Sequence, residues 1–184
     1  MKKTIIILMV FFAMILQTNA QLFITKSGSI NFYSDGPLEK IEAHNNQVNS
    51  ALNTETSDLV FKVLMKSFVF EKALMQEHFN ENYVESDKFP TALFKGKVTN
   101  IKSEDFLVMG NHDAKVEGDL TIHGIKKHIK GTGVFKVSDT GITGTSKFFV
   151  KLDDYDISIP GAVSGKIAEE IEISVTVELK PLKK

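Results

Sequence analysis

Histidines and carboxylates are the side chains of this sequence that could do chemistry at neutral pH, and they occur in short groups. His123 and His128 flank the segment 124–127, so a tight turn there would make the two histidines cross-strand neighbours. Two imidazoles can ligate zinc, but zinc sites use three or four protein ligands, and no third ligand stands nearby in the sequence. We therefore expect a polar pair beside a turn, and we predict neither a metal site nor another cofactor.

Two further groups contain the residue types of a functional site without the rest of its pattern. The segment 110–113, Gly-Asn-His-Asp, is interpreted as a solvated loop. The segment 153–156, Asp-Asp-Tyr-Asp, is rich in carboxylates but lacks the glycine and the closing glutamate of a calcium loop. The sequence also lacks cysteine, a Gly-x-Ser-x-Gly elbow, a phosphate-binding loop and a dinucleotide fingerprint. We predict that the protein is not an enzyme.

His78 lies in the stretch 67–96, the one place where the hydrophobic pattern changes from strand to helix. Residues recur there at helical spacing, and Pro90 bars a helix from the preceding residue onward. The stretch predicts one short helix packed at residues 70–83, with aromatic side chains that belong to a core. On this helix His78 can fix the helix to the adjoining loop, for example through Tyr83. Alternatively, it can hydrogen-bond a ligand headgroup at a cavity mouth.

The rest of the chain alternates apolar and polar residues with period two, as half-buried strands do. Asn45-Asn46 and the segment 53–57 are interpreted as loops. We expect about eight strands, drawn from the segments 29–33, 40–46, 59–66, 92–98, 106–109, 116–122, 129–137, 142–152 and 171–179. The fold class is therefore all-β. An antiparallel sheet with one apolar face must cover it with a second sheet or close on itself.

The first twenty residues have the pattern of a cleaved secretory signal peptide. Lys2 and Lys3 precede an unbroken apolar run from Ile5 to Leu16, and Ala20 is small, as a cleavage site requires. The run is too short for an ordinary membrane span, although an uncleaved anchor is the alternative. We predict a signal peptide at 1–20, one domain at 21–184, a periplasmic or secreted location, and no stable membrane insertion after cleavage.

The composition limits the partners of the protein and the sources of its stability. The 184-residue chain has a formal net charge of −1, and all its basic residues are lysine. It therefore lacks the basic balance and the arginine forks typical of nucleic-acid binders, so we predict no nucleic-acid partner. Without cysteine there are no disulfides, and the domain must be stable through its core alone. A homodimer is compatible with the sequence.

Glycines are frequent on the inward face of the expected strands, at Gly96, Gly118, Gly131, Gly133 and Gly144. Glycine weakens a strand, so it marks a bend or the close approach of another group. One interpretation is that these glycines are the bends that a barrel needs. The other is that the missing side chains leave a narrow apolar lumen, which in an eight-stranded barrel can hold one slender ligand.

The second interpretation predicts that inward side chains, with His78 at the mouth, bind an apolar ligand. The predicted ligand-binding residues are Phe61, Met65, His78, Phe94, Gly96, Gly118, Leu120, Ile122, Gly131, Gly133, Phe135, Phe148, Ile173 and Val175. One rival hypothesis is a filled barrel that serves as a structural or interaction domain. Another is an enzyme of lipid or isoprenoid metabolism with His78 or His123 as its acid or base.

Two motifs resemble those of the YceI-like family. The first, from Met75 to Gly96, reads Met-x-x-His-Phe-x-x-x-Tyr-x-Glu-Ser-x-x-Phe-Pro-x-Ala-x-Phe-x-Gly, and the second, from Gly118 to Lys127, reads Gly-Asp-Leu-Thr-Ile-His-Gly-Ile-Lys-Lys. The resemblance covers roughly residues 28–180 and is indistinct before Asp58. It implies an extended, lipocalin-like antiparallel β-barrel in the periplasm. It also implies that the lumen holds a long apolar chain, such as a polyisoprenoid or a fatty-acyl derivative.

Overall fold

The computed structural model describes residues 22–161 and 165–182, and the predicted signal peptide at 1–20 lies outside them. Within these residues the strands are β1 (Leu22–Asp35), β2 (Lys40–Asn53), β3 (Asp58–Leu64), β4 (Val69–Phe70), β5 (Thr91–Val98), β6 (Gly110–Ile122), β7 (Ile125–Ser138), β8 (Gly141–Lys151) and β9 (Glu170–Pro181). The helical segments are α2 (Ala73–His78), the π-helical turn η2 (Phe79–Tyr83) and the 3-10 turns η1 (Met65–Ser67), η3 (Asp105–Leu107) and η4 (Asp153–Tyr155). None of the helices in this part of the chain is long and apolar enough to cross a membrane.

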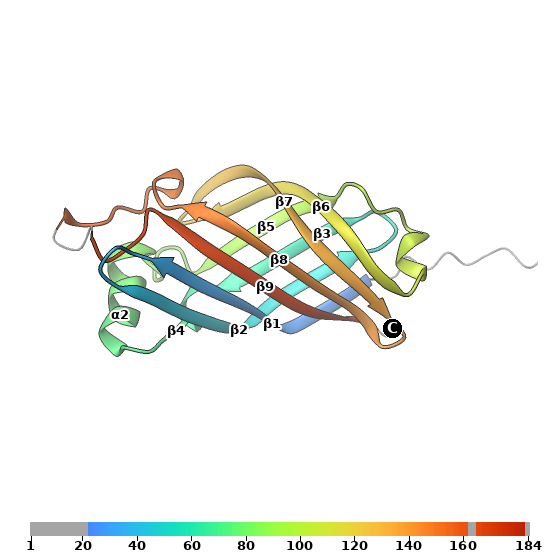
Figure 1. Cartoon of the computed structure of the whole chain (residues 1–184), viewed down its shortest axis with the longest axis horizontal. Coiled ribbons are helices and arrows are strands. Elements are labelled where there is room, and N and C mark those ends of the chain that lie inside the picture. The colour runs from blue at the N-terminus through green and yellow to red at the C-terminus, as the bar shows by residue number, and fades with distance from the viewer. Residues whose placement is uncertain (1–21, 162–164, 183–184) are drawn as a thin grey trace, which may run out of the picture.

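The strands form one antiparallel sheet that closes into a barrel (Figure 1). The order of the wall is β1-β9-β8-β7-β6-β5-β3-β2, and pairing of β2 with β1 completes the circle of eight strands. β4 lies outside this circle and pairs with β2 at Ala43 and His44, beyond the part of β2 that pairs with β3. The prediction of an all-β, eight-stranded antiparallel barrel with one short helix is confirmed.

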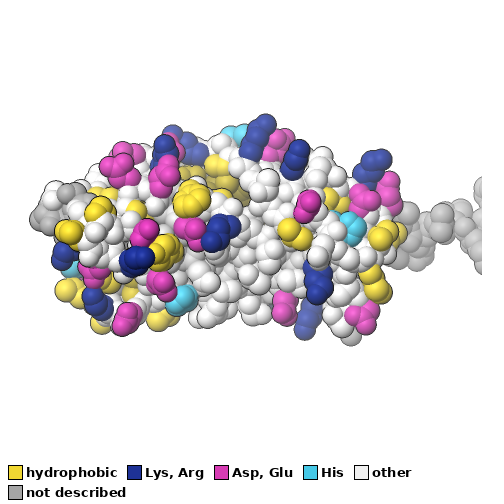
Figure 2. Space-filling view, in the orientation of Figure 1, with side chains coloured by type: hydrophobic (Ala, Val, Ile, Leu, Met, Phe, Trp, Pro, Cys, Tyr) yellow, Lys and Arg dark blue, Asp and Glu magenta, His cyan; other side chains and the backbone are white. Residues whose placement is uncertain are grey.

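Period-two alternation directs the apolar face of each strand into the barrel. Along β9, Ile171, Val177 and Leu179 are at most 2% exposed, whereas Thr176 and Glu178 between them face solvent. The outward positions of the wall carry lysine and acidic side chains, and both signs are interspersed on the face shown in Figure 2. The strands therefore separate a dry interior from a charged outer surface.

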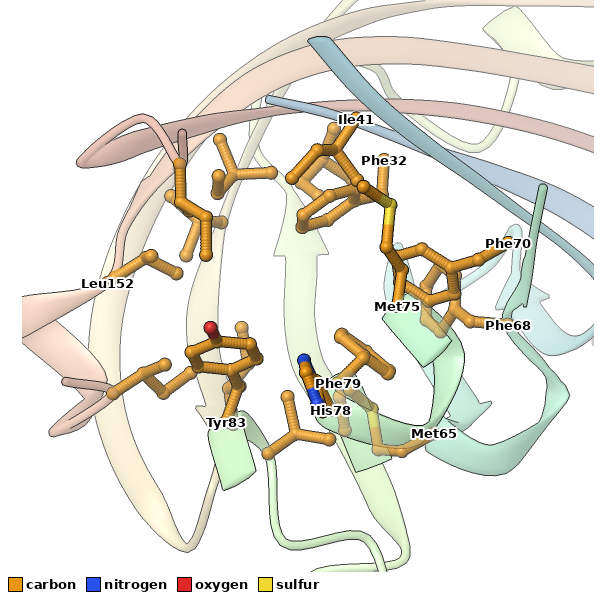
Figure 3. Close-up of a pocket in the computed structure, with 18 of the residues that line it drawn as sticks. Phe32, Ile41, Met65, Phe68, Phe70, Met75, His78, Phe79, Tyr83 and Leu152 are labelled. Carbon is orange, nitrogen blue, oxygen red and sulfur yellow. The ribbon is translucent and has the colours of Figure 1, made fainter. Parts of the chain in front are cut away.

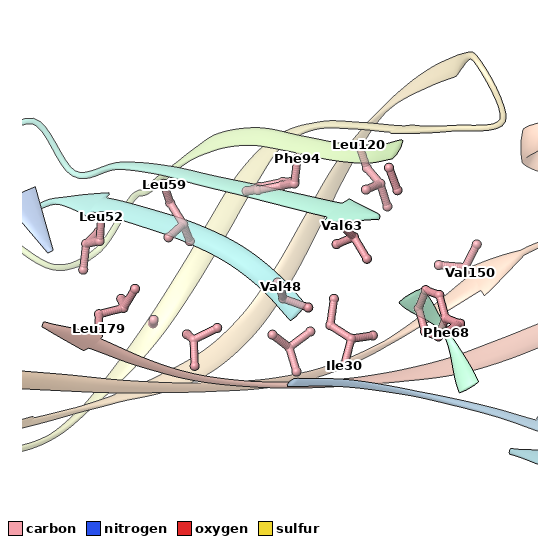
Figure 4. Packing of buried hydrophobic residues seen from close by; sticks show 14 of the residues in the cluster. Ile30, Val48, Leu52, Leu59, Val63, Phe68, Phe94, Leu120, Val150 and Leu179 are labelled. Carbon is pink, nitrogen blue, oxygen red and sulfur yellow. The ribbon is translucent and has the colours of Figure 1, made fainter. Parts of the chain in front are cut away.

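Large aliphatic side chains fill the end of the barrel away from α2 (Figure 4). Leu52 on β2, Ile142 on β8 and Leu179 on β9 are each at most 1% exposed. Phe106 of η3 packs edge-on against Phe135, with 5.9 Å between the ring centroids. Burying a side chain of this size stabilises the folded state by about 1.5–3 kcal/mol. This filled end therefore contributes to the stability of the fold.

Several predicted elements differ in the structure, and the segment 110–113, interpreted as a loop, is the first part of β6. The strand predicted at 106–109 is wrong, because residues 105–107 form η3 instead. The Asp105 carboxylate accepts a hydrogen bond from the backbone N–H of Lys102 at 2.9 Å, and this bond turns the chain. The helix predicted at 70–83 begins only at Ala73, and Phe70 belongs to β4.

The loop predicted at Asn45-Asn46 is also wrong, because β2 runs through both residues. The Asn45 side chain is fully buried. Its Nδ2 donates to the carbonyl oxygen of Leu64 at 2.9 Å, and its Oδ1 accepts from the backbone N–H of Gln47 at 2.9 Å. The bond to Leu64 holds β2 to the end of β3, where β4 replaces β3 as the neighbour of β2.

Asn45→Ala should lower the free energy of unfolding by about 1–3 kcal/mol, because it removes both hydrogen bonds from a buried position. Urea denaturation followed by circular dichroism measures the change. Asn46→Ala, at the exposed neighbouring position, is the matched control and should change the stability by less than about 0.5 kcal/mol. Equal stability of the two variants would contradict the role assigned to Asn45.

Candidate functional site

A cavity of about 430 Å³ opens at the α2 end of the barrel (Figure 3). Its volume lies within the range of small-molecule sites. One side of its wall comes from the barrel strands, with Phe32, Ile173 and Val150 among the lining residues. The other side comes from η1, α2 and η2, through residues such as Met65 and Met75. Most of the lining side chains are apolar, so the cavity favours a hydrocarbon surface.

Four phenylalanine rings hold α2 and η2 against the barrel. Phe79 of η2 lies 5.0 Å from Phe70, 5.6 Å from Phe68 and 6.2 Å from Phe32, measured between ring centroids. Tilted and edge-on ring pairs of this kind are favoured beyond the area they bury. All four rings also line the cavity, so the contacts that fix the helix form one wall of the mouth.

A smaller cavity of about 130 Å³ lies deeper in the lumen. The two cavities share part of their lining and therefore follow one another along the barrel; the shared residues are Ile30, Val63, Ala92, Leu120 and Phe148. Beyond these, the deeper cavity reaches Leu59, Phe135 and Val177, next to the filled end. The lumen is thus a narrow apolar slot that runs inward from α2.

The inward glycines divide into two groups. A Cβ at Gly131 would meet no atom within 4 Å, so this position borders open space. A Cβ at Gly133 would lie 2.5 Å from the carbonyl oxygen of Thr145, and one at Gly96 or Gly118 would lie 2.3 Å from the backbone of the paired strand. The interpretation that a missing side chain leaves a lumen therefore applies at Gly131, and not at Gly96 or Gly118. Gly96 and Gly118 allow β5 and β6 to approach closely, whereas Gly131 leaves room in the lumen.

Most residues predicted to bind a ligand do line the two cavities. The mouth cavity contains Met65, His78, Leu120, Ile122, Phe148 and Ile173 of the predicted set. The deeper cavity contains Phe61, Phe94, Leu120, Gly131, Gly133, Phe135, Phe148 and Val175. Gly96 and Gly118 line neither of these two cavities. Contact between any of these residues and a ligand stays a prediction.

Sequence reasoning missed the lining residues that come from the first two strands and from η2. Phe32 and Ile41 line the mouth from β1 and β2, where the alternation is weak. The alternation of Ile30 with Phe32 was the available signal for this part of the wall. Tyr83 follows His78 by five residues. The hydrogen bonds of a π-helix join residues five apart, so a π-helical turn, unlike an α-helical one, brings residues at this spacing to one side of the helix.

The mouth carries the few polar groups of the cavity. His78 and Tyr83 point into it (Figure 3), and within the described part of the chain neither side chain has a hydrogen-bond partner. The bond from His78 to Tyr83 that the sequence allowed is therefore not formed. Burial raises the pKa of the Tyr83 hydroxyl, so this group is neutral and can donate or accept a hydrogen bond. At the rim, Lys72 lies 2.7 Å from Glu39 and lowers the pKa of that carboxyl.

The predicted cross-strand pair of His123 and His128 does not form. β6 and β7 pair as far as Ile122 and Ile125, so the turn is the two-residue His123-Gly124 and not the segment 124–127. Both turn residues have positive φ, 51° at His123 and 77° at Gly124, as a tight hairpin of this hand requires. A histidine tolerates this conformation better than most residues do, and the sequence pattern gave no sign of it.

The two histidines instead have separate partners. His123 Nε2 lies 2.8 Å from the Glu85 carboxylate, and His123 Nδ1 lies 3.0 Å from the carbonyl oxygen of Tyr155. The contact with His123 lowers the pKa of Glu85. His128 Nδ1 lies 3.0 Å from Asp119. Among the residues that the structure describes, no group of three histidine, aspartate or glutamate side chains is arranged to hold a metal ion.

Comparisons with known proteins find solved structures of similar fold. Among solved structures, a polyisoprenoid binding domain from Saccharophagus degradans implicated in plant cell wall breakdown superimposes with a TM-score of 0.75, covering 89% of this chain and 99% of that one at 13% identity. Burkholderia cenocepacia BcnA gives a TM-score of 0.68, with 83% and 94% covered at 13% identity. The Campylobacter jejuni YceI protein gives 0.62, with 77% and 85% covered at 16% identity.

At sequence identities this low, the structural likeness shows that the fold is shared and nothing more. A comparison with the curated proteins finds no match. The family model of the YceI-like domain matches residues 23–179, which includes all nine strands of the described chain except the ends of β1 and β9. The chain therefore belongs to the YceI-like domain family.

Proposed function

We propose that the protein binds a long apolar chain of the polyisoprenoid or fatty-acyl type. The observation that carries the proposal is the pair of adjoining apolar cavities inside a closed barrel, with open space at Gly131. A chain in this lumen leaves water for aliphatic and aromatic walls, which is favourable by about 25 cal/mol per Å² before the costs of association. The Saccharophagus domain, which has the same fold, is named a polyisoprenoid binding domain, and this name supports the ligand class.

A neutral polar headgroup fits the mouth of the lumen. Among the described residues His78 and Tyr83 have no hydrogen-bond partner, and both point into the cavity, so each can form a hydrogen bond with a hydroxyl, carbonyl or amide of the ligand. In this arrangement the head lies beside α2 and the tail extends toward Gly131. The headgroup then fixes the orientation, while burial of the tail supplies most of the affinity.

We also propose that the protein binds its ligand without reacting with it and that it works outside the cytoplasm. Within the described part of the chain, neither His78 nor Tyr83 has a hydrogen-bond partner that would activate it, as a catalytic pair requires. Export to the periplasm or beyond is supported by the sequence of residues 1–20, with its lysines, apolar run and small residue.

Gly131→Leu should fill the deeper cavity and weaken the binding of geranylgeraniol, a C20 isoprenoid alcohol, by about tenfold or more, because extra methylenes in an occupied space cost ~1–3 kcal/mol. Native mass spectrometry of the predicted mature chain, titrated with this alcohol, measures the affinity. The fold should be kept, because the new Cβ meets no atom within 4 Å. Gly133→Leu is not equivalent, since it would clash with the Thr145 carbonyl oxygen and lower the melting temperature.

Thr176→Leu is the matched control for Gly131→Leu, because it adds a leucine to the exposed outer face of β9. This control should bind geranylgeraniol as the unchanged protein does. Full affinity in a folded Gly131→Leu variant would show that the chain does not reach this part of the lumen.

His78→Ala and Tyr83→Phe should each weaken the binding of geranylgeraniol by about two- to tenfold, the loss expected for one hydrogen bond. The same variants should bind phytane, a branched C20 hydrocarbon without a headgroup, as the unchanged protein does. Glu81→Ala, on the exposed side of η2, is the control for substitutions in this segment. If both ligands lose affinity equally, the two side chains support the wall and do not hold a headgroup.

A further inference from the structure

The ladder between β7 and β8 is incomplete. The two strands pair only between residues 133–138 and residues 141–146. β7 nevertheless continues along β6 to its first residue, and β8 continues along β9 to its last. Residues 125–132 of β7 and 147–151 of β8 therefore face each other without pairing, and Figure 1 shows β7 arching away from β8.

Contacts close both ends of this gap. At one end, the Ser146 hydroxyl donates a hydrogen bond to the carbonyl oxygen of Thr132 at 2.7 Å. At the other end, Lys127 Nζ lies 3.5 Å from the Asp154 carboxylate of η4. The β7 residues between these contacts, 128–131, span about 13 Å at the usual rise of ~3.3 Å per residue. We call the gap between residues 128–131 and residues 147–151 the β7–β8 window.

The lysines beside the window are held away from it. Lys130 on β7 pairs with Glu117 on β6 at 3.4 Å, and Lys147 on β8 pairs with Glu172 on β9 at 2.7 Å. In the order of the sheet, both acids lie on the next strand beyond, on the side away from the gap. These two ion pairs therefore lie on either side of the β7–β8 window and do not bridge it.

The side chains at the window are apolar and lead into the deeper cavity. Ile129 and Gly131 from β7 and Phe148 from β8 line that cavity. A side chain is missing at Gly131, where a Cβ would meet no atom within 4 Å. On the outer face of β8, Phe149 is 62% exposed. Apolar side chains therefore lie along the way from the outer surface through the window to the lumen.

We propose that the β7–β8 window is a lateral portal through which the apolar chain enters and leaves the lumen, an inference that rests on the proposed function. The mouth beside α2 carries the Lys72–Glu39 ion pair on its rim, and a chain threaded there would pass these charges along its whole length. Entry through the side lets a chain move from an apolar surface into the lumen segment by segment, with little hydrocarbon in water. Because the two facing edges are unpaired, passage breaks no ladder hydrogen bond.

A covalent bridge across the window tests this proposal. The chain has no cysteine, so Lys130→Cys/Lys147→Cys supplies two thiols on opposite borders, which a short bis-maleimide joins. Lys136→Cys/Thr143→Cys is the matched control, because these residues are directly opposite each other in the paired part of the same two strands. Stopped-flow fluorescence of N-dansyl-geranylgeranylamine, a neutral probe with a C20 isoprenoid chain, exchanged with phosphatidylcholine vesicles, gives the uptake and release rates before and after bridging.

Bridging the window should slow uptake and release by about tenfold or more, because it raises the barrier to passage. The equilibrium affinity should change little, since the bound state is the same. The control bridge should leave both rates unchanged. Unchanged rates in the bridged window variant would overturn the portal and assign passage to the mouth. Failure of the unbridged protein to bind the probe would instead refute the proposed function, and the portal with it.

Discussion

Closure of the sheet between β1 and β2 is the constraint on which the rest of the structure depends. Outside the β7–β8 window, the closed sheet pairs the backbone groups of its wall with neighbouring strands and leaves no long edge to protect. The period of two then fixes which side chains face inward, so the sequence controls the interior one residue at a time. Eight strands enclose a space that side chains can just fill. A few small residues are therefore enough to hollow it.

The two ends of the barrel differ in how completely side chains fill the interior. At one end Leu52, Ile142 and Leu179 fill the interior and provide stability without disulfides. Toward α2 the inward side chains leave two adjoining cavities, and the phenylalanines around Phe79 keep the helix in place over them. A core that was filled throughout would be more stable by the usual cost of a cavity. The hollow half is thus a departure from maximal stability that the filled half can support.

Much of the fold could be predicted from the sequence, because the alternation along β5 to β9 is regular and Pro90 marks the end of the helical stretch. Asn45 shows why the remainder could not. Asparagine is typical of loops. Its burial in a strand is favourable here because its side chain bonds to the carbonyl oxygen of Leu64, which is distant in the sequence. The site was predictable where inward positions alternate, as at Phe148, and not where a π-helical turn adds Tyr83 to the lining of the cavity. The β7–β8 window could not be predicted from the sequence, because both strands keep their alternation on either side of it.

The pairing of β1 with β9 joins the first and last strands of the described chain, for example at Ile30 and Val175. Contacts between such distant segments slow folding, because a long loop must close before they form. Until β9 docks, β1 and β8 each present an open edge to other chains. A polypeptide that emerges amino terminus first therefore holds an unfinished barrel until its last strand arrives. Synthesis that stops short of β9 would yield an aggregation-prone sheet, so only the completed chain encloses the two cavities.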